Sequence, residues 1–306
     1  MNGYVDLQVN GYAGIDFNTE SLTGEQLHQA CQALERDGVQ GILATLITDD
    51  ISALQRKIAR IVQIREQDPL VHDMIWGLHI EGPFISPEPG YIGAHPACFA
   101  RPADCGLMDQ LLQAGDGLIR LVTLAPEMDP SCEVTQFLSR QNILVAAGHS
   151  NASRDQLSAA IDAGLNLFTH LGNGCPQSLP RHDNIIQRAL SLSDRLWISV
   201  IADGAHLPFF VLENFLRQTG AEKIIVVTDA ISAAGCGPGR FQLGDRWVNV
   251  GEDGVPRADD HSHLVGSGTT MPQMARNLTS QLRLPLETVE ALTKWNPREL
   301  LHGIPA

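Results

Sequence analysis

Histidine and carboxylate side chains recur in this sequence where short apolar runs end. Glu81, His149 and His170 each stand at such an end, far apart along the chain. Imidazole and carboxylate groups are ligands of Zn²⁺, Fe²⁺, Mn²⁺ and Co²⁺, and three protein ligands with one position open to water are typical of a catalytic metal. The pattern predicts that the fold brings these three residues together around one divalent metal ion.

Asp229 also follows an apolar run, at the end of Val226–Thr228. A carboxylate beside a metal can take a proton from water and deliver it to a leaving amine. From local sequence alone, an N-cap or an Asx turn explains Asp229 equally well, and a single histidine at a strand end is more often structural than functional. The recurrence of such residues at most of the run ends favours the functional interpretation.

These residues need elements that bring them to one place. Short, almost continuously apolar runs alternate with helical-looking segments, as in a parallel sheet that is covered on both faces. This alternation favours an α/β fold, the (β/α)8 barrel of metal-dependent amidohydrolases, in which the carboxyl ends of all strands meet on one face. A doubly wound open sheet is the alternative, but the glycine-rich first turn usual there is missing. The predicted strands are Val5–Val9, Val39–Leu46, Met74–Ile80, Leu118–Leu124, Ile143–Ala147, Leu165–Thr169, Trp197–Ala202 and Lys223–Thr228.

Helices are predicted between these strands, and several open with a good N-cap such as Thr23 or Ser153. Two long segments rich in glycine and proline, Gly82–Ala103 and Gly172–Asn184, follow the third and sixth strands. Loops of that length in a compact domain are usually functional or disordered. The predicted helices are Thr23–Arg36, Ile51–Glu66, Cys105–Ala114, Ser131–Arg140, Ser153–Ala163 and Pro208–Thr219.

The segment after the eighth strand is predicted to form a β-hairpin. It spans Phe241–Val255 with a turn at Gly244–Asp245, followed by the last helices. We therefore expect residues 1–306 to form a single catalytic barrel domain with a small insertion near residues 241–264.

The composition excludes several kinds of partner. A formal charge of −14 argues against nucleic acid, although one arginine or helix N-terminus can still hold a small phosphorylated ligand. The sequence has no apolar run of membrane-spanning length and no secretory signal in residues 1–6. Six cysteines without a C-x-x-C pair are typical of free thiols in a reducing compartment. We expect a cytoplasmic protein that acts on a small molecule, without a nucleic acid or membrane partner.

Nine short motifs surround the candidate residues, in order from residue 4 to about residue 302. They are Val5-Asp-Leu-Gln-Val-Asn-Gly11, His79-Ile-Glu-Gly-Pro-Phe84, Gly93-Ala-His95, Leu124-Ala-Pro-Glu-Met128, Gly148-His-Ser-Asn-Ala152, Thr169-His-Leu171, Ile201-Ala-Asp-Gly-Ala-His206, Val227-Thr-Asp-Ala230 and Val265-Gly-Ser267. Together they resemble the N-acetylglucosamine-6-phosphate deacetylases, a family of the amidohydrolase superfamily. One such motif is weak evidence, but nine in register are strong.

The resemblance implies one divalent metal ion per subunit, held by Glu81, His149 and His170. Zn²⁺ is the first candidate, and Fe²⁺, Mn²⁺ and Co²⁺ accept the same ligands. The resemblance further implies Asp229 as the general base and acid that removes the acetyl group from N-acetylglucosamine-6-phosphate or a close N-acetyl amino sugar. The products are acetate and the amino sugar.

The resemblance also implies residues that bind the substrate. An arginine at the position of Arg181 often reaches the site across a dimer interface in this family, so we expect a homodimer. Gln8 and Asn10 stand where the superfamily commonly has a His-x-His pair, and since neither has an imidazole we expect one metal rather than two. The expected substrate-binding residues are Gln8, His95, Asn173, Gly174, Arg181, His206, Val265 and Ser267.

The sequence departs from the family at three places. The chain starts almost on the first strand and stops at Ala306, so we expect the accessory β-sandwich of the family to be missing, either naturally or by trimming. The family's loop T-H-L-x-N-A-M is here Thr169-His-Leu-Gly-Asn-Gly-Cys175. Asp183 is expected near the substrate phosphate, which its charge would repel.

Two other functions stay open on this evidence. One is hydrolysis of a different N-acyl or cyclic amide, since the altered loop lies where specificity is expected. The other is a barrel that binds metal or sugar without turnover, such as a sensor or an assembly subunit. The retained set of Glu81, His149, His170 and Asp229 favours catalysis, because binding alone does not require all four.

Overall fold

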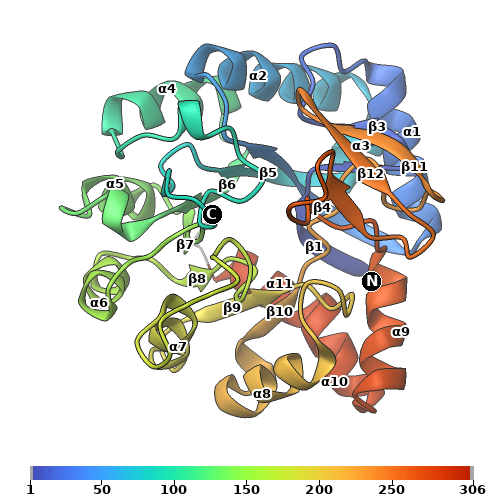
Figure 1. Ribbon diagram of the computed structural model, residues 1–306. Coiled ribbons are helices and arrows are strands. Elements are labelled where there is room, and N and C mark those ends of the chain that lie inside the picture. Colours follow the sequence, from blue (N-terminus) through green and yellow to red (C-terminus); the bar gives the residue numbers. More distant parts are fainter. Residues whose placement is uncertain (1–2, 304–306) are drawn as a thin grey trace.

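Eight parallel strands form the central sheet of the computed structural model, which describes residues 3–303 (Figure 1). Each strand pairs with the next one along the barrel, and a parallel bridge from Val9 to Ala230 links the first strand to the segment after the last. The predicted (β/α)8 barrel and all eight predicted strands are thereby confirmed. The strands are β1 (Tyr4–Val9), β4 (Val39–Ile47), β5 (Ile75–Glu81), β6 (Ile119–Leu124), β7 (Leu144–Ala147), β8 (Leu167–Phe168), β9 (Trp197–Val200) and β10 (Ile224–Val226).

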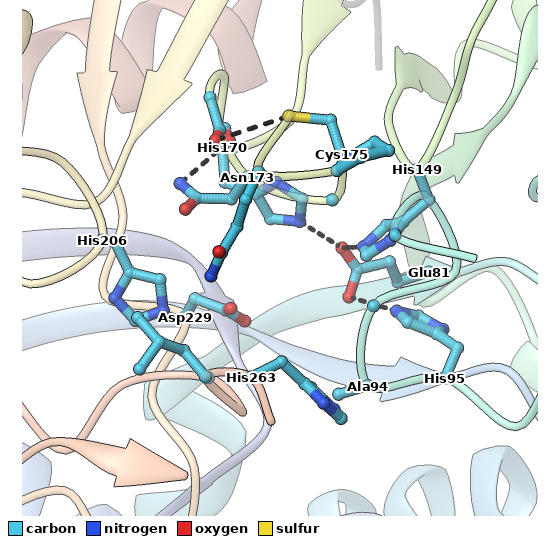
Figure 2. A pocket seen from close by; sticks show the side chains of 18 of the residues that line it. Glu81, Ala94, His95, His149, His170, Asn173, Cys175, His206, Asp229 and His263 are labelled. Carbon is cyan, nitrogen blue, oxygen red and sulfur yellow. Dashed lines mark hydrogen bonds and ion pairs between the residues drawn. The ribbon is translucent and has the colours of Figure 1, made fainter. Parts of the chain in front are cut away.

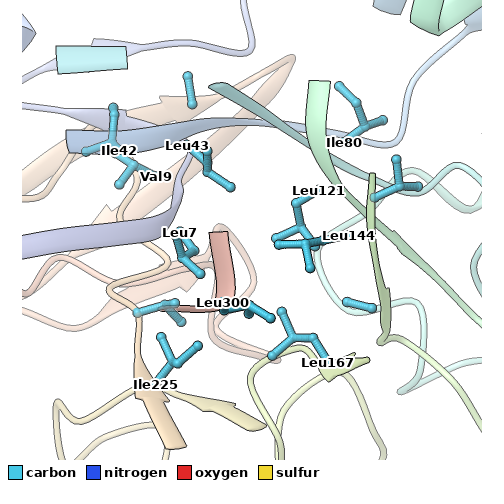
Figure 3. Packing of buried hydrophobic residues seen from close by; sticks show 14 of the residues in the cluster. Leu7, Val9, Ile42, Leu43, Ile80, Leu121, Leu144, Leu167, Ile225 and Leu300 are labelled. Atoms are coloured by element: carbon cyan, nitrogen blue, oxygen red, sulfur yellow. The ribbon is translucent and has the colours of Figure 1, made fainter. Parts of the chain in front are cut away.

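The barrel interior is a packed apolar core (Figure 3). Leu7, Leu121 and Leu144 come from three different strands and are each at most 1% exposed. Leu300, in the last helix, belongs to the same cluster. Burying a side chain of this size stabilises the fold by roughly 1.5–3 kcal/mol, so the core fixes the strands whose carboxyl ends carry the candidate residues.

All six predicted helices are present, and Thr23 and Ser153 form capping boxes as N-caps of α1 and α6. Two short helices, α3 and α7, were not predicted. No helix within residues 3–303 is long and apolar enough to span a membrane. The α-helices are α1 (Gly24–Arg36), α2 (Ile51–Gln67), α3 (Pro69–Met74), α4 (Cys105–Gly115), α5 (Glu133–Arg140), α6 (Arg154–Asp162), α7 (Ile185–Leu190), α8 (Phe209–Thr219), α9 (Met271–Gln281), α10 (Leu286–Glu290) and α11 (Asn296–His302). Short 3₁₀ turns lie at Ala97–Phe99, Pro126–Met128 and Ala221–Lys223, and a π-helical turn at Ala291–Trp295.

A separate three-stranded antiparallel sheet follows β10. Its strands β11 (Gly239–Leu243) and β12 (Arg246–Val250) pair across the Gly244–Asp245 turn, and β13 (Pro256–Ala258) adds a third strand. Apolar side chains of this sheet pack against Ile47, next to the carboxyl end of β4. The sheet thus lies at the barrel face where the candidate residues meet. A two-stranded ribbon, β2 (Gly11–Tyr12) and β3 (Ile15–Asp16), follows β1.

Asp6 ties β1 to the end of β10, where the barrel closes. Its buried carboxylate accepts hydrogen bonds from the backbone N–H groups of Gln8 (3.2 Å) and Thr228 (3.1 Å) and from the Thr228 hydroxyl (2.5 Å). Burial nevertheless raises the pKa of Asp6 from 3.8 to about 7. The seam of the barrel therefore contains a carboxyl group that titrates near neutrality.

We expect Asp6 to make the protein less stable as the pH rises towards neutrality. Because its pKa is higher in the folded than in the unfolded chain, the folded protein binds the proton more tightly, and this stabilisation is lost as the pH rises through about 7. Asp6→Asn keeps an acceptor for both N–H groups and removes the titration. At about pH 8 the variant should have a free energy of unfolding higher by on the order of 1–3 kcal/mol, and at about pH 5 a smaller gain or none. Urea unfolding at the two pH values measures this; an equal difference at both would contradict it.

Candidate active site

The four residues of the predicted metal and proton-transfer site meet at one pocket on the carboxyl face of the barrel (Figure 2). Glu81 ends β5, and His149, His170 and Asp229 follow β7, β8 and β10. Figure 2 shows His206 and Asp229 on one side of the pocket and Glu81 with His149 on the other. The fold therefore assembles the set that the spacing of the sequence predicted.

Glu81 lies at the centre of a ring of imidazoles. Its Oε1 is 3.0 Å from His170 Nε2 and 3.4 Å from His149 Nε2, and its Oε2 is 3.6 Å from His95 Nε2. Burial alone would raise the pKa of Glu81, but the contacts with the three histidines outweigh burial and hold the pKa well below its usual range. The pocket floor thus carries an ionised carboxylate with several nitrogen donors around it.

Three of the four candidate metal and proton-transfer residues adopt the left-handed backbone conformation. The φ angles are +52° at His149, +33° at His170 and +49° at Asp229. A side chain with a Cβ is strained there by roughly 1–2 kcal/mol, so other contacts must hold the backbone in place. Backbone strain at three strand ends of one barrel face is typical of a functional site.

A backbone carbonyl orients His149. Its Nδ1 lies 2.8 Å from the backbone carbonyl oxygen of Tyr91, which can only accept a hydrogen bond. Nδ1 must therefore carry a proton, and Nε2 is the nitrogen that faces Glu81. A carbonyl that fixes the tautomer in this way is typical of a metal-ligating histidine.

His95 lies just as close but has the opposite tautomer. The donor atoms of Glu81, His95 and His149 all lie within 4.8 Å of one another, so distance alone admits His95 as a metal ligand. However, the backbone N–H of Thr48 donates to His95 Nδ1 at 3.3 Å. Nε2 then carries the proton, and burial lowers the pKa of His95 to about 4, which keeps the ring neutral. His95 is thus suited to donate a hydrogen bond into the pocket rather than to bind a metal.

His170 completes the donor set. Its Nε2 faces Glu81, and its Nδ1 is buried without a hydrogen-bond partner among residues 3–303. A carboxylate with two imidazole Nε2 atoms that contact no protein group except this carboxylate is the ligand chemistry of a divalent transition metal. Glu81, His149 and His170 therefore fit such an ion.

The Gln8 amide connects Glu81 to Asp229, and the Asn10 amide also bonds to Asp229. Gln8 Nε2 donates to Glu81 Oε1 (3.0 Å) and to Asp229 Oδ1 (3.1 Å), and Asn10 Nδ2 donates to the same Oδ1 (2.8 Å). Burial and the charge of Glu81 raise the pKa of Asp229 to about 6. Asp229 can therefore exchange a proton near neutral pH. Gln8, expected to bind substrate, lies between the two carboxylates and is not among the residues lining the pocket.

His206 lies on the pocket wall, held by Asp203. Its Nδ1 is 2.7 Å from Asp203 Oδ2, and the Ser267 hydroxyl donates to the same oxygen at 3.3 Å. Burial opposes ionisation of Asp203, but its bonds with His206 outweigh burial and lower its pKa. Asp203 thereby orients His206 so that the other ring nitrogen is left for a ligand.

Val265 and Ser267, predicted to bind substrate, are buried behind the pocket wall. Their neighbours Leu264 and Gly266 line the pocket instead. Val265 joins the apolar cluster under the three-stranded sheet, and Ser267 supports Asp203.

Asn173 and Gly174 line the pocket as predicted. Asn173 Nδ2 donates to the backbone oxygen of His170 (3.2 Å), which anchors the loop. Gly174 has φ +60°, and a Cβ there would lie 2.9 Å from His149 Nδ1. The glycine thus lets the altered loop pack directly on His149.

The segment around Arg181 lies outside the pocket. Arg181 is exposed and is not among the pocket-lining residues, none of which is a lysine or arginine. Asp183 is 81% exposed and pairs with Arg188 at 2.6 Å. Within one chain Asp183 therefore points to solvent with its charge paired, and its repulsion of a substrate phosphate stays a prediction.

Sequence reasoning missed other residues of the pocket. Leu243 of β11 and His263 after β13 line it, although the hairpin pattern gave no sign that this sheet reaches the site. Thr48 and Asp203 were visible as polar residues at strand ends, but only their contacts show that they orient His95 and His206.

The barrel and its donor set together define the class of metal-dependent amidohydrolases. No family model matches the chain. The N-acetylglucosamine-6-phosphate deacetylase of Bacillus subtilis (strain 168) is 31% identical over 280 residues, 91% of this chain and 69% of the relative. The N-acetylgalactosamine-6-phosphate deacetylase of Escherichia coli O157:H7 is 30% identical over 302 residues, 98% of this chain and 74% of the relative.

Solved structures agree with these relatives. An Asp-to-Ala mutant of N-acetyl-D-glucosamine-6-phosphate deacetylase from Mycobacterium smegmatis, in complex with N-acetyl-D-glucosamine-6-phosphate, matches with a TM-score of 0.89 and 30% identity, covering 100% of this chain and 78% of that one. The chain therefore belongs to the N-acetylglucosamine-6-phosphate deacetylase family. This confirms the resemblance carried by its motifs.

We expect metal content to separate His95 from the other histidines. His149→Ala and His170→Ala should each weaken metal binding by about 100-fold or more, because each removes a ligand. His95→Ala should retain the metal, since its Nε2 carries a proton. Elemental analysis after dialysis against a dilute metal buffer measures this. Loss of metal from His95→Ala, with retention in His170→Ala, would contradict the assignment.

Proposed function

We propose that the chain hydrolyses the acetamide of N-acetylglucosamine-6-phosphate, or of a close N-acetyl amino sugar, to acetate and the amino sugar. The observation that carries this proposal is the position of Asp229, a carboxyl group with a pKa near 6, beside the cluster around Glu81. Relatives named for N-acetylglucosamine-6-phosphate and for its 4-epimer, N-acetylgalactosamine-6-phosphate, match equally well. The proposal therefore includes both sugars as substrates.

The cofactor in this proposal is one divalent metal ion held by Glu81, His149 and His170. Zn²⁺ is the first candidate, with Fe²⁺, Mn²⁺ and Co²⁺ as alternatives. Such an ion, when bound, polarises the acetamide carbonyl and lowers the pKa of a water molecule towards neutrality. The amides of Gln8 and Asn10, in place of a His-x-His pair, support one ion rather than two.

The protein's own side chains move the protons. Asp229 takes a proton from the water that attacks the acetyl carbon. The Nε2–H of His95 donates to the carbonyl oxygen as negative charge develops there. Asp229 then gives its proton to the nitrogen as the C–N bond breaks, and the electron pair of that bond stays on the nitrogen.

His206, Asn173 and Gly174 are proposed to contact the sugar or its phosphate, since all three line the pocket. Among residues 3–303 no lysine or arginine lines it, so a phosphate dianion would need a cation from elsewhere. This supports Arg181 of a second copy as the missing cation, and with it a homodimer. Gln8, Val265 and Ser267 would act by supporting the residues that touch the substrate.

We further propose that residues 1–306 act as one catalytic domain in the cytoplasm. The contacts that hold Glu81 and Asp229 all come from residues of the barrel and its loops, which supports a self-sufficient site. The altered loop at Gly174 and Cys175 keeps another N-acyl or cyclic amide open as the substrate. A barrel that binds without turnover is disfavoured by the proton-carrying Asp229.

Asp229→Asn should abolish proton transfer while leaving the metal ligands intact. We expect kcat to fall by about 10³-fold or more with unchanged metal content, because a carboxamide can neither accept nor deliver the proton near neutral pH. Acetate release from N-acetylglucosamine-6-phosphate measures kcat, and elemental analysis measures the metal. Turnover close to that of the wild type would contradict the role of Asp229.

A substrate panel tests specificity. We expect kcat/KM to be highest for N-acetylglucosamine-6-phosphate or its 4-epimer and at least about 10²-fold lower for unphosphorylated N-acetylglucosamine, because charge-assisted contacts to the phosphate are lost. Arg181→Ala should reduce the difference between the phosphorylated and unphosphorylated sugars. A cyclic amide or non-sugar N-acyl compound that is cleaved faster would favour the alternative substrate class.

A further inference from the structure

Asn10 carries a buried acceptor that no described residue satisfies. The residue is 1% exposed and lines the pocket. Its Nδ2 donates to Asp229 Oδ1 at 2.8 Å, whereas its Oδ1 has no hydrogen-bond partner among residues 3–303. A buried carbonyl oxygen without a partner is unfavourable, so a donor that enters the pocket beside it is stabilised there.

The orientation of this amide is fixed by its surroundings. Rotating the side-chain amide by 180° would put Oδ1 against the Asp229 carboxylate, where two acceptors repel each other. The backbone of Asn10 is also held, because its N–H donates to Ala230 O (2.7 Å) and its oxygen accepts from the Phe17 N–H (3.0 Å). The unsatisfied oxygen is thus held in a fixed orientation beside Asp229, within a residue that lines the pocket.

The position of Asp229 identifies the donor that this oxygen would accept. Asp229 Oδ1 already accepts hydrogen bonds from Gln8 and Asn10, so its Oδ2 is the oxygen left for proton transfer. In the proposed reaction that oxygen must reach the nitrogen of the scissile amide. A nitrogen within reach of Asp229 Oδ2 would also lie close to Asn10, because the Asn10 amide is hydrogen-bonded to the Asp229 carboxylate.

We propose that Asn10 Oδ1 accepts the N–H of the scissile amide and so positions the nitrogen for protonation by Asp229. This inference rests on the proposed amide hydrolysis. With the N–H held by Asn10, the electron pair that develops on nitrogen as the C–N bond weakens faces Asp229. The Asp229 proton moves to that pair, the C–N bond breaks, and the Asp229 carboxylate is restored. Asn10 is a positioning residue in this account, because it transfers no proton itself.

The ester analogue of the substrate tests this contact, because it has an oxygen in place of the N–H. Asn10→Ala should lower kcat/KM by about 10–100-fold for the acetamide, and by at least about 5-fold less for the 2-O-acetyl ester of the same sugar phosphate. Gln8→Ala is the matched control. It also removes a donor to Asp229 Oδ1 but leaves the Asn10 oxygen in place, so it should slow both substrates by the same factor.

The outcomes separate this inference from the proposed function. If the wild type cleaves the amide but Asn10→Ala slows both substrates equally, the contact with the N–H is wrong while the proposed function stands. If the wild type cleaves neither substrate, the proposed function itself fails. Metal content and thermal unfolding verify that each variant is folded, and Asn10→Ser serves as a second variant with the same expected selectivity.

Binding provides a readout that does not depend on turnover. In an Asp229→Asn background, which stops turnover but keeps an acceptor for the Asn10 amide, calorimetry should show that Asn10→Ala weakens binding of the acetamide by about 5–10-fold and leaves binding of the ester unchanged. Equal acetamide affinities of the Asp229→Asn protein with and without Asn10→Ala would overturn the inference.

Discussion

The buried carboxylate of Glu81 is the constraint on which the rest of the site depends. An anion removed from water is costly unless hydrogen bonds or opposite charge compensate it. Here the compensation comes from the neighbouring imidazoles and from the Gln8 amide. The same contacts help to hold His149 and His170 in a strained backbone conformation. A divalent ion bound in this ring would take over the role of these contacts, with the carboxylate and the two Nε2 atoms as its ligands.

The first strand determines how Glu81 and Asp229 coexist. Two buried carboxylates near each other disfavour double ionisation, and the pKa values accordingly move apart, below the usual range for Glu81 and to about 6 for Asp229. The Gln8 amide bridges the two groups, and Asn10 fixes one oxygen of Asp229. One carboxylate is thereby suited to bind a metal and the other to carry a proton. This division of roles needs no second metal on β1.

The sequence predicted the barrel and its four central residues because both follow simple rules. Apolar runs become strands, and the residues that end parallel strands meet on one face. It could not predict which ring nitrogens of His149 and His95 carry a proton, since these depend on the Tyr91 and Thr48 backbone groups. The motif Val265-Gly-Ser267 likewise does not reveal that the Ser267 side chain lies behind the pocket wall, where it contacts Asp203. The short helix α7 lies in a segment without a clear amphipathic period.

The central claim is one metal ion held at Glu81, His149 and His170, with Asp229 beside it as proton carrier. Anomalous diffraction from crystals of the chain saturated with Zn²⁺, recorded at the metal edge, tests this claim most directly. The account predicts a single peak per chain within bonding distance of those three ligands, about 2.0–2.2 Å from nitrogen or oxygen. A second peak near Gln8 and Asn10, or a single peak that has His95 in place of His170 as a ligand, would contradict it.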